Sequence, residues 1–296
     1  MYTISVLIPV YNRRESLVRA IESVLEQTYM PEEIIVADDA SDFDVKTYLQ
    51  KEYPHISEQI KVVRGKENKG VSGARNLALR NSSGDLIALL DSDDRWHPEK
   101  IEKQLAVFKK DPTVDLVFCR QWIVRGSEQK EHEKKLYRKN LFDHLITDWH
   151  APNPSTLLMK RNFLENIPFN ETMRNLEDLD WWLRFSLLEP NVQYVDEFLM
   201  YYCINEENRL SYIAYEERFK RVEKALAGWE HKVVQERGKK QYKAFRQYLL
   251  TYHAIDAFVA CSRRKDFFTM FKITSKYLWN KKRFYQLFSQ KLSGSK

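Results

Sequence analysis

Apolar runs alternate with amphipathic stretches over the first 120 residues of the chain. The continuous apolar runs predict buried strands at Ile4–Val10, Glu33–Asp39, Ile60–Gly65, Asp85–Leu90 and Val114–Cys119. Apolar positions three or four residues apart predict helices between them, at Arg14–Tyr29, Val45–Tyr53, Gly70–Arg80 and Pro98–Lys109. Strands that alternate with helices indicate an α/β fold with a mainly parallel sheet covered on both faces.

Acidic pairs end two of these expected strands. Asp38 and Asp39 end the second strand, and Asp91 and Asp93 follow the fourth in the sequence LLDSDDRWH. Ligands of parallel sheets bind beyond the carboxyl ends of the strands, so both pairs are expected at the ligand-binding edge. Carboxylates this close repel each other unless a cation lies between them, and Mg²⁺ or Mn²⁺ suits such a pair when phosphate oxygens complete the site. The alternative is an acidic turn that caps the helix starting at Pro98.

The composition restricts the cellular setting. With 296 residues the chain forms one large domain or two. Its cysteines, Cys119, Cys203 and Cys261, match no metal or disulfide spacing, which favours a reducing compartment. The N-terminus lacks the pattern of a signal peptide, and no uncharged apolar stretch reaches the roughly 20 residues that span a bilayer. We therefore expect a cytoplasmic protein, either soluble or peripheral on the inner face of the plasma membrane.

Positive charge is concentrated in the last part of the chain. The net charge is +6, but Arg263–Lys296 holds ten Lys/Arg and one acid, a balance of +9. The region after residue 206 predicts helices at Tyr215–Val234, Lys239–Cys261 and Asp266–Leu292. The last of these is basic and aromatic, which suits either an anionic membrane surface or a helix packed on the domain with a solvated basic rim. Nucleic-acid binding is disfavoured because no recognition fold accompanies the charge.

Four segments in series carry a resemblance to a known family. They are SVLIPVYNR, VADDASD, NKGVSGARNLAL and LLDSDDRWHPEKI, and with them the chain resembles the family 2 glycosyltransferases from about Ser5 to about Phe185. These are inverting enzymes that transfer a sugar from a nucleotide diphosphate sugar. The resemblance implies a GT-A (Rossmann-like) fold with a mixed, mainly parallel sheet flanked by helices. It implies a catalytic domain over 1–205, with the nucleotide sugar bound by about 1–120 and the acceptor by about 121–205, and a C-terminal helical basic region over 206–296.

The same resemblance implies a donor site. Its nucleotide-binding residues are Pro9, Tyr11, Asn12, Asp38, Asp39, Gly70, Arg75 and Asp91. Asp39 would accept a hydrogen bond from uracil, and Gly73 and Asn76 belong to the same segment as Arg75. Asp93 would bind the divalent metal, Mn²⁺ or Mg²⁺, and Asp91 would face both ribose and metal. The metal acts as a Lewis acid on the diphosphate leaving group.

Other interpretations of these donor residues stay open. Asp38 and Asp39 could form an Asx turn at a strand end. Arg75 could belong to an ordinary ion pair on a helix surface.

An inverting transfer also needs a base for the acceptor hydroxyl. The segment NLEDLDWWLRF resembles the family's ED motif and places Asp178 at the position of the base, next to Glu177. The implied acceptor contacts are His150, Asn153, Glu177 and Trp182, and Ser155 is a further candidate. The alternative makes Asp178 a helix cap and Trp182 a core residue.

The predicted function is an inverting, metal-dependent glycosyltransferase. It would move glucose, galactose or an N-acetylhexosamine from a UDP-sugar to a hydroxyl of a glycan or lipid-linked glycan, in bacterial surface polysaccharide, lipopolysaccharide or lipid-linked oligosaccharide synthesis. A polyprenyl-phosphate sugar synthase is disfavoured by the intact ED motif, because attack by a phosphate needs no base. A nucleotidyltransferase is disfavoured because PVYNRRES replaces its glycine-rich loop, and a non-catalytic module by retention of all the carboxylates. The charge-dense segment Gly126–Lys139 predicts a mobile loop over the acceptor side, or a solvated face with no role.

Overall fold

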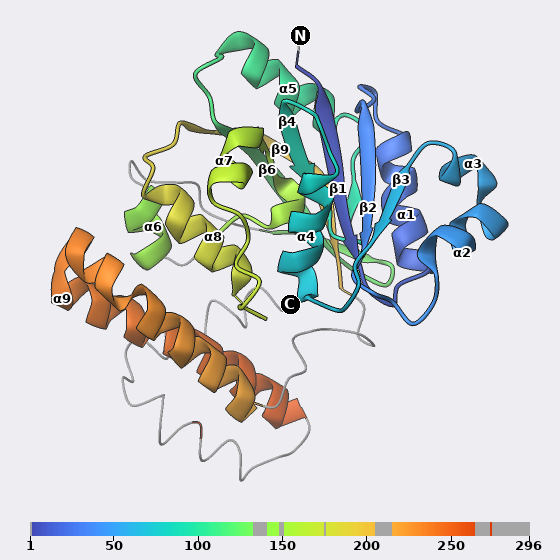
Figure 1. Cartoon of the computed structure of the whole chain (residues 1–296). Coiled ribbons are helices and arrows are strands. Elements are labelled where there is room, and N and C mark those ends of the chain that lie inside the picture. Colours follow the sequence, from blue (N-terminus) through green and yellow to red (C-terminus); the bar gives the residue numbers. More distant parts are fainter. Residues whose placement is uncertain are drawn as a thin grey trace. The chain divides into compact units, whose positions relative to one another are not determined.

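The computed structural model describes residues 2–132, 141–147, 151–174, 176–204, 215–263 and 273. The chain divides into two compact units (Figure 1). The first comprises Met1–Phe142 with His150–Asn208, and the second comprises Asp143–Trp149 with Arg209–Lys296. Among the described helices, none has the length and apolar character that crossing a lipid bilayer requires.

The first unit is built on a mixed sheet. Its described strands are β1 (Ile4–Val10), β2 (Glu33–Asp38), β3 (Lys61–Arg64), β4 (Leu86–Leu89), β5 (Arg95–Trp96), β6 (Leu116–Arg125), β7 (Glu128–Glu131), β8 (Leu158–Lys160) and β9 (Val192–Cys203). They lie in the order β3-β2-β1-β4-β8-β6-β9-β5, with β7 beside β6. The pairs from β3 to β4 and the pair β6–β9 are parallel, while β8 is antiparallel to β4 and β6.

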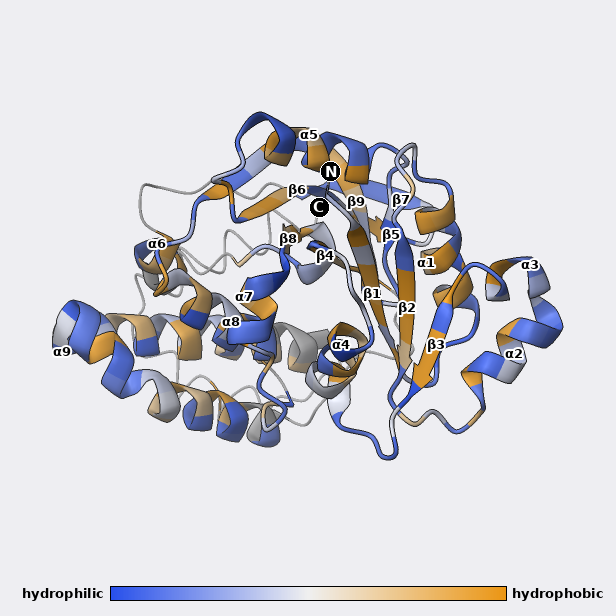
Figure 2. Cartoon of the chain, turned by 45° about the horizontal axis from the view of Figure 1, so that its top comes forward, coloured by the Kyte–Doolittle hydropathy of each residue, from blue (hydrophilic) through white to orange (hydrophobic). Residues whose placement is uncertain are grey.

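Helices cover both faces of this sheet (Figure 2). They are α1 (Glu15–Leu25), α2 (Val45–Glu52), α3 (Pro54–Ser57), α4 (Gly70–Arg80), α5 (Lys100–Lys110), α7 (Arg161–Asn166) and α8 (Glu177–Ser186), with a 3₁₀ turn η1 (Pro154–Thr156). Alternate residues of β1 divide between the faces. Ile4, Val6 and Ile8 share one core cluster with residues of α1, α2 and α5, and α4 packs on β1 outside that cluster. The predicted α/β fold with a mixed, mainly parallel sheet is confirmed.

The charge-dense segment after β6 differs from its prediction. We expected a loop over Gly126–Lys139, but Gly126 turns the chain with φ +57° and β7 pairs with β6. Every side chain of β7 is exposed, so the strand has no apolar alternation by which a sequence pattern could reveal it. An ion pair between Arg120 and Glu131, 3.6 Å, links the two strands. Residues 133–139 lie outside the described residues.

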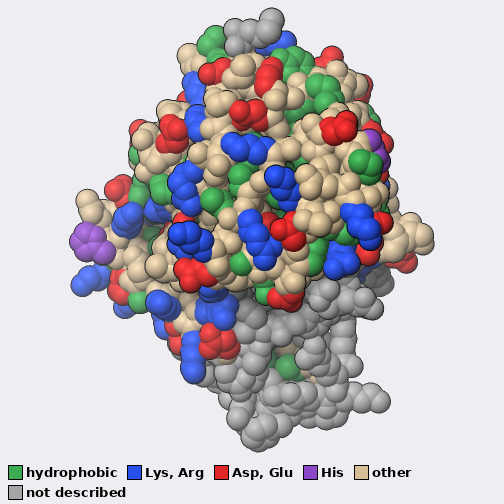
Figure 3. Space-filling model, turned by 45° about the vertical axis from the view of Figure 1, so that its right-hand side comes forward, with side chains coloured by type: hydrophobic (Ala, Val, Ile, Leu, Met, Phe, Trp, Pro, Cys, Tyr) green, Lys and Arg blue, Asp and Glu red, His purple; other side chains and the backbone are tan. Residues whose placement is uncertain are grey.

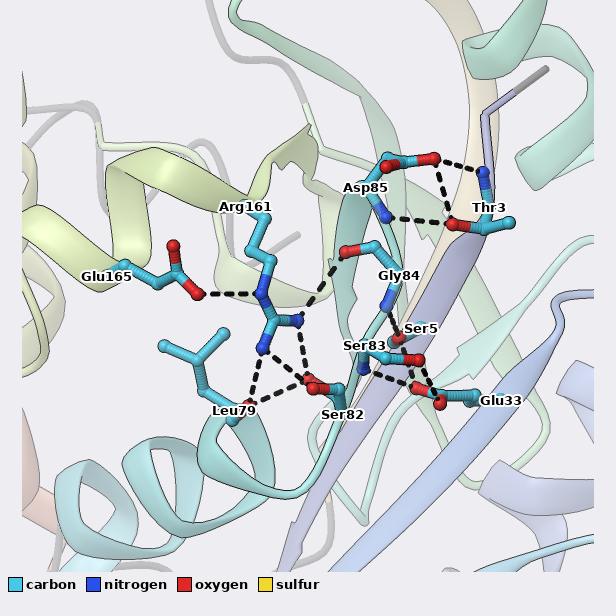
Figure 4. A network of polar contacts seen from close by, with 10 residues as sticks. All are labelled: Thr3, Ser5, Glu33, Leu79, Ser82, Ser83, Gly84, Asp85, Arg161 and Glu165. Carbon is cyan, nitrogen blue, oxygen red and sulfur yellow. Dashed lines mark hydrogen bonds and ion pairs between the residues drawn. The ribbon is translucent and has the colours of Figure 1, made fainter.

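A polar network holds the loop between α4 and β4 at the amino edge of the sheet (Figure 4). The guanidinium of Arg161 donates to the carbonyl oxygens of Leu79 and Ser82 at 3.1 and 2.7 Å, and to the Ser82 hydroxyl at 3.0 Å. It thereby supplies a charged donor to the Ser82 carbonyl just beyond α4 and adds to the Leu79 carbonyl, which also accepts from the N–H and the hydroxyl of Ser82. The carboxylate of Asp85 accepts from the backbone N–H and hydroxyl of Thr3, both at 2.9 Å, which ties the same loop to the residue directly before β1.

Replacing Arg161 by methionine should lower the stability of the first unit. The variant keeps most of the aliphatic stem but removes the charged donor from the Ser82 and Leu79 carbonyls, and hydrogen bonds from a charged donor contribute about 2 kcal/mol to the free energy of unfolding. Glu165→Gln is the matched control, because it removes only the exposed ion pair with Arg161, a change of about 0.5 kcal/mol or less. Urea denaturation of both variants measures the difference, and equal losses would contradict this role for Arg161.

The second unit contains a long helical segment, α9 (Tyr215–Arg263), which is interrupted at Gly238 with φ +83°. The two halves pack on each other, since the Tyr242 hydroxyl donates to the Leu226 carbonyl at 3.1 Å and the rings of Trp229 and Phe245 lie 6.2 Å apart. The predicted helices on either side of residue 238 are therefore confirmed. The unit also contains most of α6 (Leu141–Thr147). The helix predicted over 266–292 lies outside the described residues, apart from residue 273.

Candidate active site

The parallel register brings three loops to one edge of the sheet. Val10, the last residue of β1, is level with Asp38 of β2, and Leu7 of β1 is level with Leu89 of β4. The chain therefore leaves β1, β2 and β4 at the same edge, where the predicted acidic pairs also lie. The first turn of α4 joins them there, because Asp39 accepts hydrogen bonds from it.

The loop after β1 is fixed by Asn12, which adopts φ +52°. Its backbone N–H donates to the Ser41 hydroxyl at 2.9 Å. Its side-chain amide donates to the Asp42 carboxylate and accepts from the Asp42 N–H, both at 2.8 Å. The Asn12 amide thus joins two strand-end loops. Two neighbours, Pro9 and Tyr11, are also predicted to bind the nucleotide. Pro9 is buried inside β1, while Tyr11 is 44% exposed.

The acidic pair at the end of β2 is largely occupied by protein contacts. Asp38 accepts from the Ser41 N–H at 2.9 Å and forms an ion pair with Arg64. Asp39 accepts from the backbone N–H groups of Lys69 and Gly70 at 2.8 and 2.7 Å, so it caps α4. Burial raises the pKa of Asp39, although these two N–H groups oppose the shift. Both carboxylates therefore hold loops at this edge, Asp38 the loop after β2 and Asp39 the start of α4.

Gly70 begins α4 in a conformation that requires glycine. Its φ is +77°, and a Cβ atom there would lie 2.8 Å from Nη1 of Arg174. That guanidinium donates to the side chain and the carbonyl of Asn68 at 2.9 and 3.0 Å. The glycine predicted from the motif thus allows the turn into α4 to lie against Arg174.

Arg75 links the two carboxylate motifs. Its guanidinium, 2% exposed, lies 2.7 Å from Asp91 and 3.4 Å from Glu177, and 4.9 Å from the centre of the Phe169 ring. It is therefore a buried bridge and not a surface ion pair. Burial raises the pKa of Glu177 to about 7, with a further contribution from the charge of Asp178 and an opposing one from Arg75. The bridge brings the end of β4 and the start of α8, which are far apart in sequence, to one place.

Asp93 forms an ion pair with a residue that the sequence analysis missed. Its carboxylate, 30% exposed, lies 3.1 Å from Nη1 of Arg13, two residues beyond the exposed Tyr11. The sequence held a signal for this pair, because Arg13 closely follows the first strand and Asp93 follows another strand that ends at the same edge of the sheet. The adjacent Asp94 differs, because it is buried and donor groups of Ser155 and Cys203 contact it at 2.6 and 3.2 Å. Burial, with the charges of Asp93 and Asp91, raises the pKa of Asp94 well above its ordinary value.

The predicted base lies in the first turn of α8. Leu176, directly before the helix, has φ +63°, a conformation that costs energy for a residue with a side chain. Asp178 is half-buried and its carboxylate accepts from the Leu179 N–H at 2.7 Å. The next acid, Asp180, is paired with Arg184 at 2.8 Å.

Trp182 corrects one expectation for the acceptor side. Its ring is completely buried and its indole N–H donates to the Pro152 carbonyl at 3.1 Å, so no face of the ring is available to a sugar. It packs against Trp181 and Phe185 as a core residue, since apolar aromatic area is most stable away from water. The side chain of Asn153 accepts from the Ser155 N–H at 2.8 Å and caps η1. His150 lies outside the described residues.

Asn76 also has a structural partner. Its amide donates to the Phe169 carbonyl at 2.8 Å and accepts from the Phe169 N–H at 3.0 Å. It donates further to Glu171 at 3.1 Å. Asn76 therefore holds the turn before α8 against α4, although the motif suggested a place near the nucleotide.

The carboxylates at the edge fit a hard cation only in part. No group of three or more His, Cys, Asp or Glu side chains arranged to hold a metal occurs within the described ranges. Asp91 and Asp93 are partly exposed and supply two oxygen-donor side chains. Mg²⁺ is commonly bound by one or two carboxylates with substrate phosphates and water completing its shell, so this pair suits a cation that arrives with a diphosphate.

A comparison with protein families decides the assignment. The family model described as "Glycosyl transferase family 2" matches residues 5–173, more than half of the chain. The chain belongs to this family. This family 2 protein is therefore a glycosyltransferase, and the matched range contains the strand-end loops, Arg75 and the Asp91–Asp93 pair.

Two relatives are similar to this glycosyltransferase over different lengths. An uncharacterized glycosyltransferase of Methanocaldococcus jannaschii is 27% identical over 215 residues, which cover 71% of this chain and 74% of that one. WfgD of Escherichia coli, named as a UDP-Glc:alpha-D-GlcNAc-diphosphoundecaprenol beta-1,3-glucosyltransferase, is 38% identical over 109 residues, 37% of this chain and 42% of its own length. Other relatives are much longer than this chain, which spans 26% to 30% of the length of three of them.

A solved structure has the same fold. The crystal structure of Staphylococcus aureus TarS 1-349 in complex with UDP-GlcNAc matches this glycosyltransferase with a TM-score of 0.60. The match covers 93% of this chain and 91% of that one at 17% sequence identity. At this identity the match shows a shared fold, in agreement with the GT-A fold expected from the sequence.

Proposed function

We propose that this glycosyltransferase moves a sugar from a UDP-sugar to a hydroxyl of a glycan, with inversion, in the synthesis of a bacterial surface polysaccharide or lipid-linked oligosaccharide. The observation that carries the proposal is the buried Arg75 bridge between Asp91 and Glu177, which holds the donor motif beside the predicted base Asp178. The printed names of the relatives support the substrates, since WfgD uses UDP-Glc with a diphosphoundecaprenol-linked GlcNAc and TarS was crystallised with UDP-GlcNAc.

The donor side would be organised by the strand-end loops. Asp91 and Asp93 would hold a divalent cation, which when bound acts as a Lewis acid on the diphosphate leaving group. Arg13 and Arg75, the cationic partners of these carboxylates, add positive charge near that diphosphate. The exposed Tyr11 offers a ring beside the loops for the nucleotide base.

The acceptor side would use the start of α8. Asp178 would take the proton from the acceptor hydroxyl as that oxygen attacks the anomeric carbon. Glu177, with its pKa raised to about 7 and its carboxylate directed to Arg75, would orient this turn of the helix. The left-handed Leu176 sets the direction in which the chain enters α8.

A panel of nucleotide sugars tests the proposal. Thermal unfolding of the protein is measured with UDP-, GDP-, dTDP- and CMP-sugars, each with Mn²⁺ and with EDTA. We expect stabilisation by a UDP-sugar that requires Mn²⁺, because binding to the native state raises the unfolding temperature. Stabilisation only by a sugar of another nucleotide would contradict the proposed donor. The best donor is then incubated with a diphosphoprenol-linked GlcNAc to look for a new glycoside.

Association with anionic membranes is a further prediction of this function, made from the sequence alone. The segment Arg263–Lys296, with its charge balance of +9, lies almost wholly outside the described residues. On the face shown in Figure 3, basic and acidic side chains are interspersed. Each basic residue near an anionic surface contributes about 1 kcal/mol, so the tail should give binding that salt weakens. Co-sedimentation of the full chain, and of a chain ending at residue 262, with phosphatidylglycerol vesicles measures this. Absence of salt-sensitive binding by the full chain would refute the prediction.

A further inference from the structure

Ser155 is completely buried, and its backbone N–H, carbonyl and hydroxyl all form hydrogen bonds. Its backbone N–H donates to the Asn153 side chain at 2.8 Å, and its carbonyl accepts from the indole N–H of Trp96 at 2.8 Å. Its hydroxyl donates to the Asp94 carboxylate at 2.6 Å and accepts from the Asp91 N–H at 3.0 Å. The residue is thus fixed by its own turn, through Asn153, and by the stretch from Asp91 to Trp96.

The two hydroxyl contacts close the turn that carries the acidic pair. Asp91 and Asp94 are already joined by a hydrogen bond from the Asp94 N–H to the Asp91 carbonyl, 3.0 Å. The Ser155 hydroxyl contacts the backbone N–H of Asp91, the first residue of this turn, and the carboxylate of Asp94, the last. Asp93 lies between these two anchored positions, so the direction of its carboxylate depends on the turn that Ser155 closes.

A third contact ties the same turn to the end of β9. The other oxygen of Asp94 accepts from the Cys203 N–H at 3.2 Å. Because a hydroxyl can donate to a carboxylate or accept from a carboxylic acid, either protonation state of Asp94 keeps its contact with Ser155. The arrangement connects η1, the acidic turn and β9 through two buried side chains.

We propose that Ser155 is a positioning residue that holds the Asp91–Asp93 turn in the geometry which binds the metal–diphosphate of the donor. The inference rests on the proposed function, in which this pair binds the cation. It replaces the expectation that Ser155 contacts the acceptor, since its side chain has no exposed surface. Groups that orient metal ligands without touching the metal commonly change metal affinity by about 10- to 100-fold when removed.

The test compares Ser155→Ala with Thr156→Val. Thr156 is the neighbouring buried hydroxyl of the same turn, and it donates only within the turn, to the Asn153 carbonyl at 2.6 Å. Mn²⁺ is titrated calorimetrically into each protein at a saturating concentration of UDP. We expect the apparent Mn²⁺ affinity of Ser155→Ala to fall by about 10-fold or more, and that of Thr156→Val to stay at the wild-type value. Ser155→Cys, which retains a weak donor of similar size, should be intermediate.

The outcomes separate this inference from the function on which it rests. Absence of Mn²⁺-dependent UDP binding by the wild-type protein would contradict the proposed function. Wild-type Mn²⁺ affinity in Ser155→Ala, or an equal loss in Thr156→Val, would overturn the positioning role while leaving the function intact. If Ser155→Ala fails to fold, Ser155→Cys decides, because an unchanged Mn²⁺ affinity in that variant also overturns the role. With the donor identified, a donor KM of Ser155→Ala that is raised at limiting Mn²⁺, and that Ser155→Cys partly restores, would support it.

Discussion

Replacing Asp93 by asparagine should abolish sugar transfer and remove the metal dependence of UDP binding. Asparagine keeps the shape of the side chain but removes the negative charge that would attract the cation. The repulsion between the two phosphates of the donor would then lack its main compensation, which a bound metal supplies as a Lewis acid. Because Asp93 is partly exposed and paired with Arg13 at the edge of the fold, the substitution should leave the stability nearly unchanged.

Calorimetric titration of UDP with Mn²⁺ and with EDTA measures this effect. Asp111→Asn is a suitable control, since Asp111 caps the end of α5 and accepts from Thr113 outside the strand-end site. The control should bind UDP in the same metal-dependent manner as the wild type. Equal UDP affinity of the wild-type protein with and without EDTA would contradict the assignment of Asp93.

Replacing Asp178 by asparagine should reduce transfer by about 100-fold or more while donor binding persists, because the amide cannot accept the proton of the acceptor hydroxyl. The half-buried carboxylate lies in the first turn of α8, and its contact with the Leu179 N–H is local. A loss in kcat with an unchanged donor affinity is the pattern expected for a group that acts only in the transition state.

Glu177 provides the comparison for this experiment. Its carboxylate contacts Arg75, and burial with the charge of Asp178 raises its pKa to about 7. Glu177→Gln should weaken the bridge to the donor motif and so affect donor binding as well as turnover. Near-normal turnover in Asp178→Asn together with a large loss in Glu177→Gln would transfer the role of base to Glu177.

The sequence predicted those features that depend on local pattern. The strand Ile4–Val10 and the helix Gly70–Arg80 have the expected bounds, because continuous apolar runs and glycine at a helix start are local signals. The edge on which the acidic pairs lie also followed, since it depends only on strands that run in parallel. The strand β7 was missed because an exposed edge strand needs no apolar residue.

Pairings between distant residues could not be derived from the sequence. The amide of Asn12 forms hydrogen bonds with the loop after β2, and the carboxylate of Asp39 accepts from the start of α4. Family motifs that suggest ligand contacts therefore also contain residues that hold the loops. Arg75 shows the opposite case, since its bridge to Glu177 spans 102 positions and joins two motifs. Trp182 lies in the core, as its helical spacing indicated. Its indole N–H donates to a buried carbonyl, so the ring can be buried without leaving a polar group unsatisfied.

One titration tests the division of the site into a donor side and an acceptor side most directly. UDP is titrated in the presence of Mn²⁺ into the wild-type protein, Asp93→Asn and Asp178→Asn under identical conditions. The wild type and Asp178→Asn should bind UDP with the same affinity, and Asp93→Asn should lose the binding that Mn²⁺ supports. Loss of UDP binding in Asp178→Asn with retention in Asp93→Asn would contradict the account, because it would place the donor at the start of α8 instead of at the Asp91–Asp93 turn.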